Sequence, residues 1–200
     1  MPRRSEHSLD EIRALALDAV EDLVASHGPT AISARKVAAQ IGYTVGMLYH
    51  VFDNVDDLVL QANARLVDQL ARANEAAAAG NRPQRVIARM AHNYLSLARQ
   101  APARWQLVFV HTMRDGRPVP DWYRQRTDRL FALVEEQLQR LAPRRRPAAA
   151  ALAARTLWSS VHGICLLAVS DKLDIGGSTS AEKALDSLLT HYLGSWAQSR

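Results

Sequence analysis

Apolar residues recur at the spacing of an α-helix along nearly the whole chain. Glycine and proline divide the chain into segments, and most segments carry apolar side chains at positions i, i+3 and i+4. One face of the first such segment is formed by Ile12, Leu15, Ala16, Ala19 and Leu23. No alternating strand pattern and no long internal repeat accompanies these segments. The sequence therefore predicts an all-α protein with about nine helices.

Capping residues predict where several of these helices begin and end. Ser8 and Glu11 form a capping-box pattern before the first helix, and Gly28 with Pro29 follows its end. A second capping box is expected at Thr179 and Glu182, before the last helix.

Residues 33–52 predict two short helices joined by a tight turn. Ser33 is placed to cap the first helix, Gly42 to end it, and Thr44 to cap the second. Two short helices with a glycine turn between them, preceded by a longer amphipathic helix, are typical of a helix-turn-helix. In such a unit the second helix enters the major groove of DNA, while hydroxyls and free N–H groups contact phosphates.

The segment from Ala148 to Lys172 is apolar on all sides, so it must be covered on several sides. Either its own lobe buries it centrally, or a second copy of the chain covers its outer face. The final segment carries an apolar stripe of Leu185, Leu188, Leu189, Tyr192 and Trp196. These last two helices are expected to pair with their symmetry mates in a homodimer.

Residues 12–60 resemble the DNA-binding domain of the TetR family of bacterial regulators. The resemblance is carried by Gly28, Ile32, Ser33, Arg35, Val37, Ala38, Ile41, Gly42, Gly46, Leu48, Tyr49, Phe52, Asp56, Asp57 and Leu58. Residues 158–163 resemble the Trp-His-Gly signature of one class of ligand domain in that family. The resemblance implies a homodimer on a palindromic operator, with a small-molecule effector pocket in the C-terminal lobe. It also implies a repressor that the ligand releases.

The resemblance assigns DNA contacts to eight residues. Thr44 and Tyr49 would contact phosphate, and Tyr43, Val45 and Gly46 would lie where the family reads bases. The full expected set is Arg35, Lys36, Tyr43, Thr44, Val45, Gly46, Tyr49 and His50. Val51 and Val55 stand where many members carry positive phosphate partners, and His50 is expected to compensate for one of them.

The expected domain organisation has a boundary before a long connecting helix. Residues 1–53 would form the DNA-binding domain, and residues 54–200 the ligand-binding and dimerisation domain, with the connecting helix over 54–79. Filling the pocket would shift this helix and change the spacing of the two recognition helices.

The second lobe holds most of the large aromatic or adaptable side chains that could line an apolar effector pocket. They are Met90, Tyr94, Trp105, Phe109, Met113, Trp122, Trp158 and His162. Tyr94, His111 or His162 could supply an orienting hydrogen bond. Plain core packing is the competing interpretation for each of them.

The composition excludes several classes of protein. The 200-residue chain has 48% hydrophobic residues and one cysteine, Cys165, so it is neither a disordered protein nor one with an intramolecular disulfide. No signal peptide and no uninterrupted apolar span is recognised, which predicts a cytoplasmic protein without a membrane partner. His162 and Cys165 lack a third catalytic group, so no enzyme is expected, and neither a cofactor nor a metal.

The charge is unevenly distributed along the chain. The net charge is +5, but residues 1–60 hold 5 basic and 9 acidic side chains, a net charge of −4. Hydroxyls, helix N-termini and the basic N-terminal arm with Arg3 and Arg4 are therefore expected to hold phosphate, with a shallow salt dependence. The acidic lobe also favours an alternative, in which the same fold is a protein-interaction or ligand-sequestering module that does not bind DNA.

Overall fold

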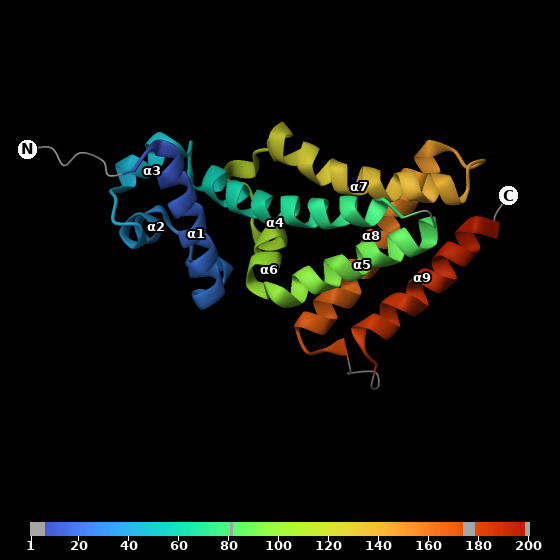
Figure 1. Ribbon diagram of the computed structural model, residues 1–200. Helices are drawn as coiled ribbons and strands as arrows, with labels where there is room; N and C mark the ends of the chain where they lie inside the picture. The colour runs from blue at the N-terminus through green and yellow to red at the C-terminus, as the bar shows by residue number, and fades with distance from the viewer. Residues whose placement is uncertain (1–6, 81, 174–178, 199–200) are drawn as a thin grey trace, which may run out of the picture. The chain divides into compact units, whose positions relative to one another are not determined.

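The computed structural model describes residues 7–80, 82–173 and 179–198, and these residues form nine α-helices and two short 3-10 helices (Figure 1). The α-helices are α1 (Leu9–His27), α2 (Ala34–Gln40), α3 (Val45–Val51), α4 (Val55–Ala78), α5 (Pro83–Gln100), α6 (Pro102–Val110), α7 (Asp121–Leu141), α8 (Pro147–Val169) and α9 (Ala181–Gln198). None of the described residues lies in a strand. The predicted all-α class is confirmed.

Most of the expected helix caps are present. Ser8 and Glu11 form the complete capping box of α1, with the Ser8 backbone N–H donating to the Glu11 carboxylate at 2.6 Å. The last helix begins differently from the prediction. Its cap is Ser180, whose Oγ accepts from the Lys183 N–H at 3.2 Å, in place of Thr179. The Glu182 carboxylate that the predicted capping box required is bound by the Arg99 guanidinium.

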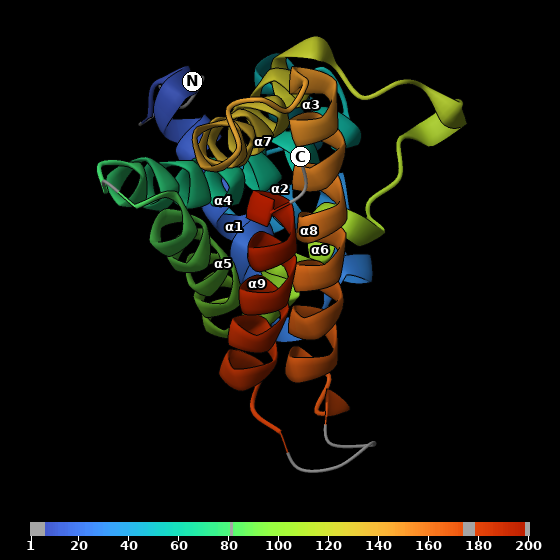
Figure 2. The same cartoon turned by 90° about the vertical axis from the view of Figure 1, so that its right-hand side faces the viewer.

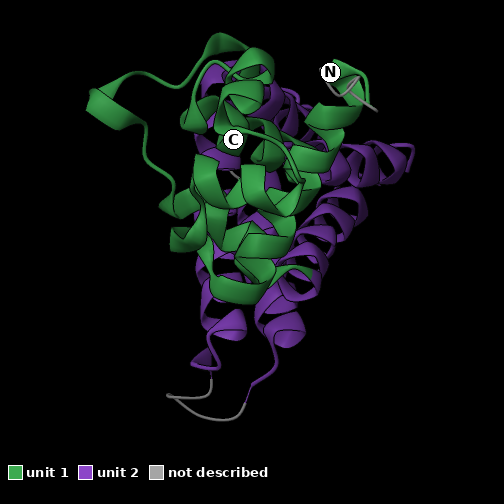
Figure 3. Ribbon diagram, turned by 90° about the vertical axis from the view of Figure 1, so that its left-hand side faces the viewer, with its two compact units in different colours: residues 1–66, 101–123 green, residues 67–100, 124–200 purple. Residues whose placement is uncertain are grey.

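The chain divides into two compact units (Figure 3). The first unit combines residues 1–66 with 101–123, and the second combines residues 67–100 with 124–200. Helices α4 and α7 each contribute to both units. The first unit thus contains α6 and the beginning of α4 as well as the three helices of the expected DNA-binding domain.

Helices α1, α2 and α3 of the first unit enclose a continuous apolar core together with the start of α4 and with α6. Ile12, Val20, Leu48 and Leu58 are among its fully buried side chains. Leu107 brings α6 into the same core. Burial of these side chains fixes α3 against α1 and leaves the opposite face of α3 exposed.

In the second unit, α8 is buried on one side and exposed on the other. The side that packs within the unit carries Ala150, Ala153, Ala154, Leu157, Val161 and Cys165. The large apolar side chains that remain exposed on α8 are Leu152 at 68%, Trp158 at 38%, Leu166 at 43% and Leu167 at 43%. Of the two interpretations of this apolar helix, central burial within its own lobe is therefore wrong. By length and composition α8 could also cross a membrane, and 28% of its most apolar window is buried within the protein.

Helices α8 and α9 run side by side (Figures 1 and 2). The α9 stripe proposed for self-association is largely used within the chain, because Leu185, Leu189 and Trp196 are all buried. The Trp196 indole N–H donates to the Leu138 carbonyl at 3.0 Å, and the Arg145 guanidinium lies 4.0 Å from the centre of the Trp196 ring. The exposed positions of α9 instead carry small or polar residues, among them Lys183, Ser187, Thr190, His191 and Gly194.

Candidate nucleic-acid interface and effector region

The turn between α2 and α3 has the geometry of a helix-turn-helix. Gly42 adopts φ +75°, a left-handed conformation that favours glycine, and the Tyr43 N–H donates to the Ala38 carbonyl at 2.9 Å. Ser33 caps α2 by accepting from the Lys36 N–H at 3.3 Å, and Thr44 caps α3 by accepting from the Met47 N–H at 3.2 Å. The two short helices are therefore held by local contacts that the sequence predicted.

The eight expected DNA contacts lie on α2, on the turn and on α3. Arg35, Lys36, Thr44, Gly46, Tyr49 and His50 are exposed, whereas Tyr43 and Val45 are partly buried. The Tyr49 side chain is 50% exposed although Leu48 beside it is fully buried. An exposed tyrosine and a capping threonine on one short helix form a surface that can donate hydrogen bonds to phosphate and to base edges.

The cationic groups of the first unit are largely used for internal contacts. Arg13 on α1 donates from Nη2 to the Val51 carbonyl at 3.1 Å, which ties α1 to the end of α3. The Arg65 guanidinium contacts Asp18 and Glu21 of α1. The terminal residues Arg3 and Arg4, considered as contacts from the sequence, lie outside the described residues.

A polar cluster at the start of α4 was not found from the sequence. The Asp56 carboxylate is 6% exposed, accepts from the Arg114 backbone N–H at 3.1 Å, and lies 3.5 Å from Nε2 of His111. This contact holds the segment after α6 against the first turn of α4, directly after the recognition helix. The sequence marked Asp56 only as part of the start of a helix, because nothing local indicates a partner more than fifty positions away.

Burial lowers the pKa of His111 below histidine's ordinary value of 6.5. The attraction of the Asp56 carboxylate opposes this effect but does not overcome it, and Arg114 lowers the pKa further. The folded protein thus binds the His111 proton less readily than the unfolded chain does.

We expect this histidine to make the protein less stable in mild acid. Because folding lowers the pKa of His111, the contribution of neutral His111 to the free energy of unfolding is complete above pH 6.5. This contribution is lost as the pH falls through the lowered pKa of the folded protein. Urea unfolding at about pH 7.5 and about pH 5.5 measures the loss. His111→Gln should lose less stability between the two pH values than the original chain, and an equal loss in both proteins would contradict the assignment.

Each half of α4 is fixed by polar contacts within its own unit. In the first unit, Arg65 binds α1 and Asp56 binds the segment after α6. In the second unit, the second half of α4 contacts α7 through Arg126 with Asp68 and through Arg129 with Glu75. The Asn93 side-chain amide on α5 donates to Asn74 and to the Ala73 carbonyl, both at 3.1 Å. The long helix is therefore anchored along its whole length.

Three of the expected effector residues come together in the second unit. The Tyr94 hydroxyl on α5 lies 2.8 Å from Nδ1 of His162 on α8, and the Trp158 ring centre lies 5.5 Å from that of His162. Burial lowers the pKa of His162. Phe131 of α7, which the sequence analysis missed, packs edge-on against Trp158 at 5.7 Å. Arg155 extends the group by lying 4.9 Å from the centre of the Phe131 ring.

The other five expected effector residues do not join this group. Met90 is buried in a small apolar cluster of the same unit with Ala77 and Val86. Trp105, Phe109, Met113 and Trp122 belong to the first unit. Trp105 is 2% exposed and packs edge-on against Phe109 at 5.3 Å, so it is a buried side chain.

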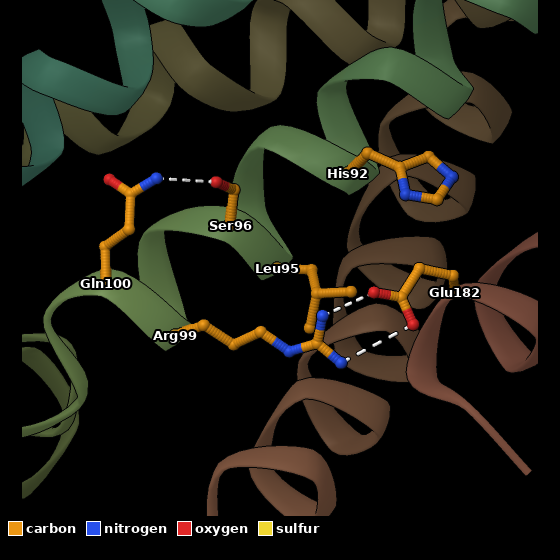
Figure 4. Close-up of a pocket in the computed structure, with 6 residues that line it drawn as sticks. All are labelled: His92, Leu95, Ser96, Arg99, Gln100 and Glu182. Carbon is orange, nitrogen blue, oxygen red and sulfur yellow. Dashed lines mark hydrogen bonds and ion pairs between the residues drawn. The ribbon is translucent and has the colours of Figure 1, made fainter.

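A polar surface pocket of about 370 Å³ lies between α5 and α9 (Figure 4). It is lined by His92, Leu95, Ser96, Arg99, Gln100 and Glu182, none of which was predicted to bind a ligand. Its charged groups are paired, since Arg99 binds Glu182 and His92 lies 2.9 Å from the Asp186 carboxylate. The hydrogen bonds to Arg99 lower the pKa of Glu182 to about 2.

Cys165 lacks the environment of a reactive thiol. It is fully buried, and burial raises its pKa to about 12. Nδ1 of His162, the histidine one turn earlier, is hydrogen-bonded to the Tyr94 hydroxyl. The thiol therefore serves as a small apolar side chain in the contact of α8 with its neighbours.

The helical class and the exposed helix-turn-helix define a helix-turn-helix DNA-binding protein. Two family models match the chain, described as "Bacterial regulatory proteins, tetR family" over residues 16–62 and "Tetracyclin repressor-like, C-terminal domain" over residues 87–192. The chain belongs to the TetR family. It is therefore a ligand-responsive DNA-binding transcriptional regulator and not an enzyme, with DNA and a small-molecule effector as its partners. The finer resemblance to the Trp-His-Gly class stays a prediction.

Solved structures share the fold over nearly the whole chain. A protein of unknown function from Rhodococcus sp. RHA1 has 17% identity and a TM-score of 0.76, with 99% of this chain and 100% of that chain covered. A TetR-family transcriptional regulator from Streptomyces coelicolor has 21% identity and a TM-score of 0.68, with 92% of this chain and 98% of that chain covered. AibR, in complex with isovaleryl coenzyme A and operator DNA, has 15% identity and a TM-score of 0.63, with coverages of 90% and 97%. A search of curated proteins gives no match.

Proposed function

We propose that this regulator is a cytoplasmic homodimeric repressor that binds a palindromic operator and leaves it when a mostly apolar effector binds. The observation that carries the proposal is the exposed surface of α3, where Tyr49 is 50% exposed on the helix that Thr44 caps. A half-exposed tyrosine on such a short helix is not explained by core packing. Two-fold symmetry would place two such helices about one DNA turn apart.

The residues of the interface divide into two roles. Thr44 and Tyr49 would hold phosphate through their hydroxyls, with Arg35, Lys36 and His50 as the nearby basic side chains. Tyr43, Val45 and Gly46, at the entry of α3, would face base edges, since the N-terminal residues of a recognition helix contact the bases. The division is testable because phosphate contacts carry no sequence information of their own.

Tyr49→Phe is expected to weaken binding to every DNA sequence alike, by about 30-fold, because each of two half-sites loses a hydrogen bond of about 1 kcal/mol. Val45→Ala is the matched contrast and should change the preferred base at one position in each half-site. Fluorescence anisotropy with the operator and with single-base variants measures both effects. A change of preference in Tyr49→Phe with none in Val45→Ala would reverse the two roles.

The aromatic group of the second unit is the proposed place of the effector contact. Tyr94 and His162 supply a polar pair beside the rings of Trp158 and Phe131, a combination suited to orient an apolar ligand. A thermal-shift screen would include acyl coenzyme A compounds, since AibR was solved with isovaleryl coenzyme A. Effector binding would favour a state of α4 that does not fit DNA.

The decisive experiment is selection of bound fragments from genomic or randomised DNA with the purified protein. An enriched palindrome supports the proposal, and the absence of any enriched sequence would overturn it. A compound that stabilises the protein should then weaken binding to the selected operator. Weakening would support a repressor released by its ligand, whereas tighter binding would contradict release.

A further inference from the structure

His7, which lies just before α1, contacts Tyr43 at the entry of the recognition helix α3. Nδ1 of His7 lies 2.8 Å from the hydroxyl oxygen of Tyr43, and the two rings meet edge-on with their centres 6.1 Å apart. The residues are 36 positions apart in sequence, so the fold and not local geometry brings them together.

Both members of this pair are fixed by their neighbours. The Tyr43 N–H donates to the Ala38 carbonyl at 2.9 Å, and its side chain packs against the core of the first unit. His7 directly precedes Ser8, whose hydroxyl and N–H both donate to the Glu11 carboxylate. The Tyr43 hydroxyl is therefore held at a defined place beside α3.

The contact decides what the Tyr43 hydroxyl can offer to DNA. A tyrosine hydroxyl has one hydrogen to donate and lone pairs with which to accept. In the tautomer that carries its proton on Nε2, the His7 ring can only accept at Nδ1, and the Tyr43 hydroxyl then donates its hydrogen to His7. The oxygen can then act toward DNA only as an acceptor. Phosphate oxygens are acceptors themselves and cannot use such a group, whereas amino groups of cytosine and adenine in the major groove can.

We propose that His7, with its ring proton on Nε2, is a specificity-determining residue that makes Tyr43 an acceptor and thereby selects a base with an amino group, cytosine or adenine, at one position of each half-site. The inference rests on the proposed role of Tyr43 as a residue that reads bases. Without His7, the Tyr43 hydroxyl is free to donate as well, and guanine or thymine becomes acceptable at that position.

The test is selection from randomised DNA with the full chain at about pH 8. His7→Phe retains the ring contact and removes the acceptor nitrogen, while Tyr43→Phe removes the hydroxyl alone. The original chain should select cytosine or adenine at one position per half-site. In both variants the preference for cytosine or adenine over guanine or thymine at this position should fall about fivefold. This factor corresponds to the loss of one hydrogen bond of about 1 kcal/mol. His27→Phe, an exposed change at the end of α1, is the matched control and should leave the preference unchanged.

The base distribution separates this role from a structural one. If His7→Phe only loosened the fold, affinity would fall for all sequences with the distribution unchanged, and this result would overturn the inference. A changed preference in Tyr43→Phe but not in His7→Phe would overturn it too. If the original chain enriches no palindrome at all, the proposed function fails first, so the two failures are distinguishable.

Discussion

Leu166→Glu on α8 is expected to convert the dimer into monomers and to weaken operator binding by about 100-fold or more. Leu166 is 43% exposed on the side of α8 opposite the buried Ala150 and Leu157. In a dimer it would be covered by the partner copy, where an unpaired carboxylate is costly. Loss of the dimer removes the second recognition helix from the complex. The affinity of two linked binding sites can exceed that of a single site by about 10²- to 10⁴-fold.

Sedimentation at micromolar concentration and anisotropy with the operator measure the two parts of this prediction. Ala76→Glu, an exposed change of the same charge on α4, is the matched control and should stay dimeric. A Leu166→Glu protein that sediments as a dimer would show that the exposed side of α8 is not the interface. Monomers that retain full operator affinity would separate dimerisation from DNA binding.

Trp105→Ala is expected to reduce the free energy of unfolding by about 3–5 kcal/mol, the usual cost of truncating a buried tryptophan. Trp105 on α6 is 2% exposed. Its truncation would leave a cavity in place of the buried indole ring. Denaturation in urea, with the linear extrapolation, gives the value.

Phe109→Ala is the matched comparison, because Phe109 packs against Trp105 but is 40% exposed. Phe109→Ala should lower the free energy of unfolding by about 1 kcal/mol, since much of the Phe109 ring already contacts solvent. Equal losses in the two variants would contradict the placement of Trp105 in the core. Sequence alone could not choose between core and pocket for these two aromatics, because both lie on one apolar helix.

Local signals in the sequence were the most informative. Ser33, Gly42 and Thr44 act within a few residues of themselves, so the caps and the turn of the helix-turn-helix could be predicted. The error at the last helix is also local, because Thr179 and Ser180 are adjacent hydroxyl residues. A second part of this error is not local, because the Glu182 carboxylate that the predicted capping box needed is bound by Arg99 of α5.

Contacts between distant segments could not be predicted. The pairing of Asp56 with His111 and that of His7 with Tyr43 depend on tertiary packing, and neither leaves a periodic pattern. The apolar side chains on all sides of α8 indicated that other helices cover it. The choice between its own lobe and a partner copy could be made only from the exposure of residues such as Leu166 in the structure. The periodicity of apolar residues shows that one face of a helix is apolar, but it does not identify the segment that packs on that face.

The division of the first unit into two separated stretches of chain affects how the protein folds during synthesis. Residues 1–66 leave the ribosome first, but Trp105 and Leu107, which belong to the same unit, follow only with residues 101–123 (Figure 3). At about 5–20 residues per second, the 57 residues from 66 to 123 take roughly 3 to 11 s to make. During that interval the nascent DNA-reading helices expose the apolar surface that α6 later covers. Binding of a chaperone to the growing chain is therefore expected between these two points of translation.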